Sequence, residues 1–295
     1  MPKIQINAMI DERAELISFE PQSGLRAIRF GEQRMIFVQL CYDESSAQAV
    51  DPLCQPFRNE HLSKYFENKV IADLLAAGCH REGDFFAVLS WRFSAKIPLS
   101  ISDVCRAMSR DEFSSDVYSF FGAVEPGRIW QLAEKKHPGI ALAARVLFSE
   151  LGLAPELFDL VGPAVYQNHF VARAEIYERY YRELLLPALR LMEQGASAEL
   201  ESLLSADSTY RNATLSKKTL RRIFGKPCIT LHPFICERLF AAWLSWNDEV
   251  KLTHVWDGRF VDEKDVLSEP ELAVYARMPA DKAAAVKSEE SADDH

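Results

Sequence analysis

Residues 34–43 read "RMIFVQLCYD", and this stretch decides the class of fold. Met35 to Leu40 form an almost unbroken apolar run that ends in polar residues. Such a run is typical of a parallel β-strand that is buried on both faces and is followed by a loop. A sheet buried in this way needs helices on both faces, so the stretch predicts an α/β fold.

Further strands and helices alternate along the chain. "DFFAVLSWRF", 84–93, and "SSDVYSFF", 114–121, are two more apolar strand signals. A helix is predicted over 61–78, and another begins near Ser102. This alternation predicts a mixed, mostly parallel sheet flanked by helices. We expect three neighbouring central strands in it, at Met35–Leu40, Phe85–Ser90 and Val117–Phe121.

The remaining segments suggest the domain organisation. Residues 1–34 hold two short alternating segments and are interpreted as a small β appendage, whereas 35–278 form a single α/β domain. The polar segment 196–226 is expected to be a flexible excursion or a lid, whose "KKTLRR" cluster would close over a diphosphate. The charged tail 279–295 is expected to be disordered. Pro187 should kink the amphipathic helix 174–194.

Composition excludes several classes of protein. The chain has 295 residues and a net charge of -9, without a block of Lys and Arg, so nucleic-acid binding is not expected. Apolar runs stay shorter than the ~18 residues of a membrane span, and the start lacks a signal-peptide core, which favours the cytoplasm. The six cysteines are dispersed and are expected to be small buried hydrophobes rather than metal ligands or disulfides.

Well-known catalytic motifs are absent from the sequence. It contains no G-x-G-x-x-G, no P-loop, no G-x-S-x-G and no zinc-hydrolase pattern. Candidates therefore come from the ends of the predicted strands, because open α/β sheets bind ligands there. Tyr42 and Arg92 follow the first two strands, and the third carries Asp116 and Tyr118. We expect these ends to converge on one crevice, in which Asp116 either binds a divalent ion or a sugar hydroxyl, or simply caps a turn.

Polar residues interrupt a further apolar strand at "YQNHF", 166–170. Gln167 and His169 should share one face of this strand and Asn168 should take the other. His169 is then either a general base or a core histidine with satisfied hydrogen bonds. His232, beside a proline at the start of a later helix, would join the same site.

That later helix, "ITLHPFICERLFAAWLSW", 229–246, is apolar nearly all round yet carries Glu237 and Arg238. Both charges are expected to be largely buried, and adjacent helical residues cannot easily face one another. They form either a structural ion pair with other elements or part of the crevice, with Glu237 as the carboxylate that faces substrate. We expect Glu237 near the "QNHF" strand or Asp116, and Arg238 against a carboxylate or backbone carbonyls.

Taken together, "MIFVQLCYD", "DFFAVLSWRFSAKIPLSISDV", "DVYSFF", "YQNHFVARAEIYERYYRELLLPAL" and "HPFICERLFAAWL" resemble a group of bacterial glycosyltransferase-like proteins of surface-polysaccharide gene clusters. This group is similar to nucleotide-sugar transferases of the GT-A type. The resemblance implies that Glu237 and Arg238 lie at the sugar site and that "QNHF" forms its floor. It places Asp116 where such enzymes keep a D-x-D that binds Mn²⁺ or Mg²⁺, although the second Asp is replaced here by Tyr118.

Two functions follow from these expectations. The first is a glycosyltransferase that moves a sugar from a nucleotide-sugar donor to a bacterial surface glycan, in the cytoplasm or peripherally at the inner membrane. The second is an inactive GT-A-like module that binds a carbohydrate or a protein. The candidate catalytic residues are Glu237, His169 and Asp116, and the candidate substrate-binding residues are Tyr42, Arg92, Tyr118, Gln167, Asn168, His232 and Arg238.

Overall fold

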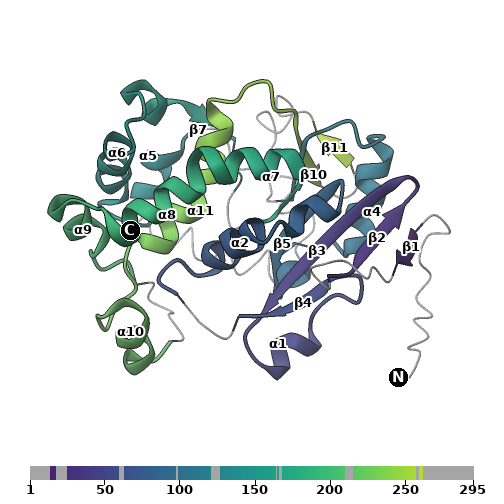
Figure 1. Cartoon of the computed structure of the whole chain (residues 1–295), viewed down its shortest axis with the longest axis horizontal. Coiled ribbons are helices and arrows are strands. Elements are labelled where there is room, and N and C mark those ends of the chain that lie inside the picture. Colours follow the sequence, from purple (N-terminus) through teal and green to yellow (C-terminus); the bar gives the residue numbers. More distant parts are fainter. Residues whose placement is uncertain are drawn as a thin grey trace, which may run out of the picture.

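The computed structural model describes one open β-sheet with helices on both faces (Figure 1). The expected α/β class with a mixed sheet and flanking helices is therefore confirmed. The expected disordered tail and Gln167 lie outside the described part of the chain. The described residues are 14–17, 25–59, 63–97, 99–120, 127–163, 165, 168–209, 215–256 and 259–261.

The main sheet has the strand order β1-β2-β3-β5-β9-β6-β10-β11, with β4 paired to β3. The pairs β3–β5, β3–β4 and β6–β10 are parallel, and the remaining pairs are antiparallel. A separate two-stranded sheet joins β7 to β8. The strands are β1 (Ala14–Ile17), β2 (Ala27–Phe30), β3 (Gln33–Cys41), β4 (Gln55–Arg58), β5 (Phe85–Ser90), β6 (Val117–Ser119), β7 (Gly127–Arg128), β8 (Val161–Gly162), β9 (Phe170–Arg173), β10 (Leu252–Trp256) and β11 (Arg259–Val261).

Two expectations about the sheet need correction. β3 and β5 are parallel neighbours as predicted, but β9 runs antiparallel between β5 and β6. The sheet is consequently mixed rather than mostly parallel. An apolar run indicates that a strand is buried on both faces, and it carries no information on the direction of the neighbouring strand. The first 34 residues also do not stand apart, because β1 and β2 extend this same sheet.

Alternate side chains of the central strands enter two separate apolar cores. Met35 and Phe37 of β3 pack on the side of α4, whereas Ile36 and Val38 pack on the side of α2, α7, α8 and α11. Figure 1 shows these two helical layers flanking the sheet. The helices are α1 (Glu44–Gln48), α2 (Glu67–Ala76), α3 (Phe93–Lys96), α4 (Ile101–Arg110), α5 (Ile129–Glu134), α6 (Ile140–Glu150), α7 (Ala174–Tyr180), α8 (Leu186–Gln194), α9 (Ala198–Leu204), α10 (Lys217–Phe224) and α11 (His232–Ser245).

The predicted helix 174–194 is interrupted just before its proline, Pro187. α7 passes through a π-helical turn at Tyr181–Leu185 into α8, with Pro187 in the first turn of α8. A proline lacks the N–H that a helix interior needs, and a widened turn accommodates this loss without ending the helix.

The described part of segment 196–226 is helical and packed. α9 begins at the capping residue Ser197, and its Leu200 and Leu204 are buried. α10 begins at the capping residue Ser216 and buries Leu220. Both helices are therefore fixed to the body by apolar side chains.

Gly162 in β8 marks a tight contact between the small sheet and α11. A Cβ at this position would lie 2.6 Å from Ile129 Cδ1, 2.9 Å from Ser245 Cβ and 3.1 Å from the Ala241 carbonyl oxygen. We expect Gly162→Ala to lower the free energy of unfolding by about 1–3 kcal/mol, because the contacts include backbone that cannot move alone. Urea denaturation measures this change. Gly195→Ala is the control, since its nearest contact is at 3.4 Å, and a similar loss there would contradict the steric explanation.

Candidate functional site

Three strand ends meet in register at the carboxyl edge of the sheet. The Trp91 N–H donates to the Leu40 carbonyl at 3.0 Å, and the Asn59 N–H donates to the Cys41 carbonyl at 2.8 Å. The chain therefore leaves β4, β3 and β5 at adjacent points, about 4.8 Å apart. The residues that follow these strands, Asn59, Tyr42 and Trp91, form the centre of the candidate site.

A partly buried polar cluster occupies the β3–β4 part of this edge. The Tyr42 hydroxyl donates to Glu67 Oε1 at 2.7 Å, and the Asn59 amide lies close to the same hydroxyl. Burial and the neighbouring carboxylate raise the pKa of Tyr42, so the hydroxyl stays neutral and keeps donating. Glu67 is the first residue of α2, where the helix dipole favours a negative charge.

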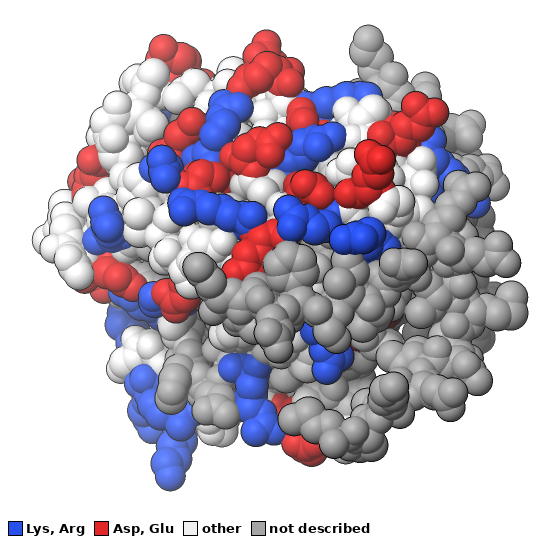
Figure 2. Space-filling view, turned by 45° about the vertical axis from the view of Figure 1, so that its right-hand side comes forward, with Lys and Arg blue, Asp and Glu red and all other residues white. Residues whose placement is uncertain are grey.

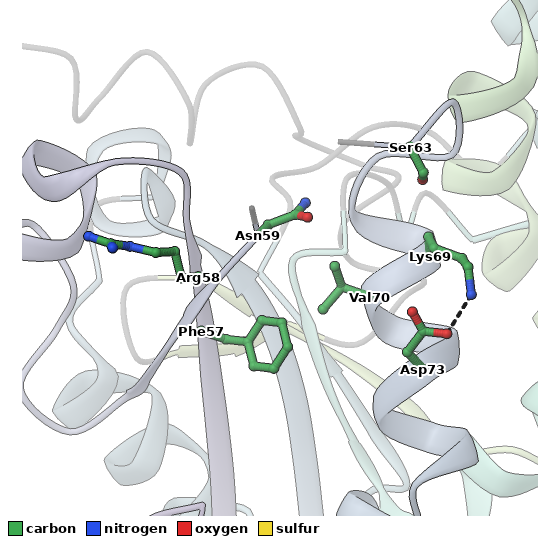
Figure 3. Close-up of a pocket in the computed structure, with 7 residues that line it drawn as sticks. All are labelled: Phe57, Arg58, Asn59, Ser63, Lys69, Val70 and Asp73. Atoms are coloured by element: carbon green, nitrogen blue, oxygen red, sulfur yellow. Dashed lines mark hydrogen bonds and ion pairs between the residues drawn. The ribbon is translucent and has the colours of Figure 1, made fainter. Parts of the chain in front are cut away.

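A cavity of about 430 Å³ opens beside this cluster, between β4 and α2 (Figure 3). The ring of Phe57 and the amide of Asn59 point from β4 toward α2, whereas Arg58 points away. Asn59 is only 5% exposed, and its Nδ2 makes no hydrogen bond of normal geometry. The amide lies against the Tyr42 hydroxyl, so it joins the polar cluster to the wall of the cavity. The lining residues are Phe57, Arg58, Asn59, Ser63, Lys69, Val70 and Asp73.

The charges around the cavity neutralise one another. Lys69 Nζ lies 2.5 Å from Asp73 Oδ1, and Arg58 is 2.9 Å from Glu44. The cavity therefore offers an aromatic face and an amide rather than a net charge. Such a lining is suited to an uncharged ring with hydrogen-bonding groups.

A free cation lies next to the cluster, at the end of β5. Arg92 is exposed, and its guanidinium lies 4.7 Å from the centre of the Trp91 ring. It makes no ion pair with any residue that the structure describes. Its planar fork is thus available for an anion at the carboxyl edge.

The start of β9 brings two further candidates to the same edge. Asn168 is nearly buried and has a φ of 55°, and His169 directly precedes β9. The His169 ring is completely buried and lies edge-on to Phe93, with the ring centres 5.8 Å apart. Its complete burial disfavours the general-base interpretation, because a base must reach its substrate.

Asp116 and Tyr118 do not lie in the crevice, contrary to expectation. Asp116 precedes β6, so it lies at the amino edge, where its oxygens contact Arg173 Nε at 3.3 Å and the Lys251 N–H at 2.9 Å. The Tyr118 hydroxyl donates to Asp111 at 2.7 Å inside the core on the α4 side. Only the residue that ends a parallel strand reaches the ligand-binding edge, and Asp116 stands at the wrong end of its strand.

Asp116 is also a poor metal ligand in this arrangement. Its Oδ1 already forms an ion pair with Arg173, and its Oδ2 accepts from the Lys251 N–H. Within the described residues, no three His, Cys, Asp or Glu side chains gather as a metal ion would need. We therefore assign Asp116 a structural role, in which it fastens the starts of β6 and β10 to the end of β9.

Glu237 and Arg238 are largely buried, as expected. Their side chains are 20% and 11% exposed, and Arg238 Nη1 lies 3.8 Å from Glu237 Oε2. Arg238 donates to the Phe234 carbonyl at 2.7 Å. A backbone carbonyl was an expected partner for Arg238, but this carbonyl belongs to the same helix as Arg238. The neighbouring Phe240 stacks on Phe170 at the start of β9, so this part of α11 lies over the β9 end of the carboxyl edge.

Two buried histidines lie at the amino half of α11. His232 accepts or donates a 2.9 Å hydrogen bond with Thr230, and its ring meets Tyr65 at 5.8 Å. His137 bonds to Ser208 at 2.6 Å and stacks on Phe234 at 3.9 Å. Burial lowers the pKa of His232 to about 3 and that of His137 to about 4. Both rings are therefore neutral packing residues at pH 7, and His137 is not the simple turn residue that its place before a proline suggested.

Sequence reasoning missed Phe57, Asn59 and Glu67. β4 is a four-residue edge strand containing Pro56, so it lacks the apolar run that revealed the other strands. Glu67 falls within the predicted helix 61–78 and looks like an ordinary surface charge. The structure instead places Glu67 in the first turn of α2, after Phe66 with its unfavourable φ of 49°, and nothing in the sequence marked this position.

Comparison with family models, with curated proteins and with solved structures finds no match to this chain. None of the described helices is long and apolar enough to cross a membrane. The interpretation of the site therefore rests on its own geometry.

Proposed function

We propose that this protein transfers a sugar from a nucleotide-sugar donor to a glycan acceptor, on a sheet of the GT-A type. The observation that carries the proposal is the arrangement at three adjacent strand ends. A neutral aromatic cavity, a Tyr42–Glu67 pair and the exposed Arg92, which makes no ion pair with a described residue, lie side by side at the ends of β4, β3 and β5. This order matches an elongated ligand that has an uncharged end and a charged middle.

The uncharged end of the donor, its nucleoside, suits the cavity. Phe57 supplies an aromatic surface for a ring, and Asn59 supplies an amide beside the Tyr42 hydroxyl. Stacking on an aromatic ring contributes about 1–3 kcal/mol per base. The paired charges of Lys69 and Asp73 leave this cavity unsuited to a diphosphate.

The diphosphate of the donor suits Arg92, which follows β5, two strands away from the β4 side of the cavity. Departure of a nucleoside diphosphate requires its growing negative charge to be neutralised, by a metal ion or by Arg and Lys. Arg92 is the exposed cation that follows the central strand β5, and its ion-pairing capacity is unused among the described residues.

The transfer also needs a carboxylate for the acceptor hydroxyl. Glu67 is already oriented by Tyr42 at 2.7 Å, and Glu237 is partly exposed on α11. We assign the acceptor base to Glu237 because Glu67 is engaged with Tyr42, which makes Glu67 a positioning residue for the cavity.

The second candidate function is an inactive module that binds a carbohydrate. It is favoured by the position of Asp116, because this carboxylate lies at the amino edge of the sheet and cannot act there as the first residue of a metal-binding D-x-D. The cavity would then hold a neutral sugar, and Arg92 would have no role in binding.

We expect Arg92→Met to weaken binding of nucleoside diphosphates by about 10–100-fold, because a charge-assisted contact contributes about 1.5–3 kcal/mol. Isothermal titration measures this for a panel of nucleosides, nucleoside diphosphates and nucleotide sugars, with and without Mn²⁺. Nucleosides, which lack phosphate, should bind Arg92→Met and wild type equally.

Arg106→Met is the matched control, since Arg106 is an exposed helical cation paired with Asp103. The transferase proposal fails if no nucleotide or nucleotide sugar binds. It also fails if Arg92→Met binds diphosphates as tightly as wild type does. Binding of free sugars alone would support the inactive module instead.

A further inference from the structure

α10 and the residue after its C-cap form a strongly basic surface on an acidic protein. Within ten residues the chain places five exposed cations, which we call the α10 basic face, while the whole chain carries a net charge of -9. None of them takes part in an ion pair with a described residue. The residues of the α10 basic face are Lys217, Lys218, Arg221, Arg222 and Lys226.

The helix presents these cations in a fixed arrangement. Lys217 and Lys218 lie one turn from Arg221 and Arg222, so the four share one side of the helix. The opposite side is held by the buried Leu220. Like charges at this spacing repel one another, and an anionic partner relieves this repulsion.

α10 is also rigidly attached to the rest of the protein. Ser216 caps its first turn, and Gly225 ends it with a φ of 70°. Phe224 meets Phe66 edge-on, with the ring centres 5.7 Å apart. Because Phe66 directly precedes Glu67, the basic helix adjoins the candidate site.

The surroundings of the helix decide which anion fits. Figure 1 shows α10 at the lower left periphery of the molecule. In Figure 2 acidic and basic side chains intermix over the upper part of the surface, whereas basic ones gather at the lower left corner, where α10 lies in Figure 1. A planar anionic surface can approach this corner alone, whereas a long nucleic acid would extend along a protein whose net charge is -9.

We infer that the α10 basic face docks this protein onto the surface of a bilayer that contains anionic phospholipids. Each Lys or Arg held near such a surface strengthens binding by about fivefold, and four of them supply a usable affinity for peripheral attachment. The attraction is electrostatic, so it weakens within a Debye length and in salt. The docking does not depend on sugar transfer, and it places the bilayer beside the Tyr42–Glu67 cluster.

Vesicle co-sedimentation tests this inference with the full chain. Vesicles of phosphatidylcholine with 30% phosphatidylglycerol should bind the protein at 50 mM NaCl and release most of it at 300 mM, and pure phosphatidylcholine vesicles should not bind. The variant Lys217→Gln/Lys218→Gln/Arg221→Gln/Arg222→Gln should bind the anionic vesicles about 100-fold more weakly or worse. Glutamine favours helices, and circular dichroism confirms that the variant is folded.

The control variant changes the same charge elsewhere on the surface. Arg106→Gln/Arg110→Gln/Lys135→Gln/Arg190→Gln also removes four exposed cations and should bind within about threefold of wild type. Equal losses in both variants would show a net-charge effect and overturn the inference, as would an absence of vesicle binding by the wild type. Tighter binding to a 20-nucleotide RNA than to vesicles, lost in the α10 variant, would assign the face to nucleic acid instead.

Discussion

Phe240→Ala should lower the free energy of unfolding by about 3–5 kcal/mol, the range for truncating a buried aromatic ring. Phe240 is 2% exposed, and its ring stacks on Phe170 with the ring centres 4.0 Å apart and the planes at 4°. Tyr180 meets the same ring edge-on at 4.9 Å. The side chain therefore joins α11 to β9 and to α7, and no neighbouring group can collapse into the space without breaking one of these contacts.

Urea denaturation with a constant m-value measures this loss. Phe224→Ala is the matched control, because Phe224 is only half-buried and makes one ring contact, with Phe66. Phe224→Ala should lower the free energy of unfolding by about 1–2 kcal/mol. A loss for Phe240→Ala that is no larger than for Phe224→Ala would mean that α11 is not anchored through this ring.

Acidification from pH 7 to pH 5 should remove about 3–6 kcal/mol of stability, because three buried histidines have folded pKa values far below the unfolded value of about 6.5. Burial lowers the pKa of His232 to about 3 and those of His137 and His254 to about 4. Each is less than 9% exposed.

The sign of this effect follows from proton binding. Between the folded and unfolded pKa values the unfolded chain binds more protons, so stability falls as pH drops below about 6.5 and is nearly constant above pH 7. Each histidine contributes about 1–2 kcal/mol over this interval. Carboxylates with lowered pKa values, such as Asp111 and Glu178, lose their contribution only at lower pH.

Denaturant titrations at pH 7, 6 and 5 measure the dependence on pH. His232→Gln should reduce it by about a third, because an amide at this position can still bond to Thr230 and does not titrate. A free energy of unfolding that stays constant from pH 7 to 5 would show that these rings are protonated in the folded protein or are not buried.

The sheet was predictable from the sequence wherever a strand is buried on both faces. Apolar runs indicated the two strands Met35–Leu40 and Phe85–Ser90. These strands pair with each other as expected. β9 was expected as a strand, but its antiparallel insertion between β5 and β6 was not, because pairing order depends on contacts between distant segments. The edge strand β4 has neither an apolar run nor a clear alternation, so it was not predicted.

The candidate site was predictable only in part, for a related reason. Tyr42 and Arg92 were found because they follow long strands whose direction was clear. Asp116 was misplaced because polar residues at the start and at the end of a short strand look alike in sequence. Asn59 and Glu67 come from elements adjacent to β3, and their closeness to Tyr42 is visible only in the folded chain.

Hydrogen–deuterium exchange with the best-binding nucleotide sugar tests most directly whether the ligand binds at the carboxyl edge of the sheet. The account predicts slower exchange at residues 39–43, 57–59, 67–73 and 91–93, which contain the strand ends and the α2 side of the cavity. It predicts unchanged exchange at 111–118 and 251–253, which surround Asp116 at the amino edge. Protection centred on Asp116, or no protection at the carboxyl edge with any nucleotide sugar, would contradict it.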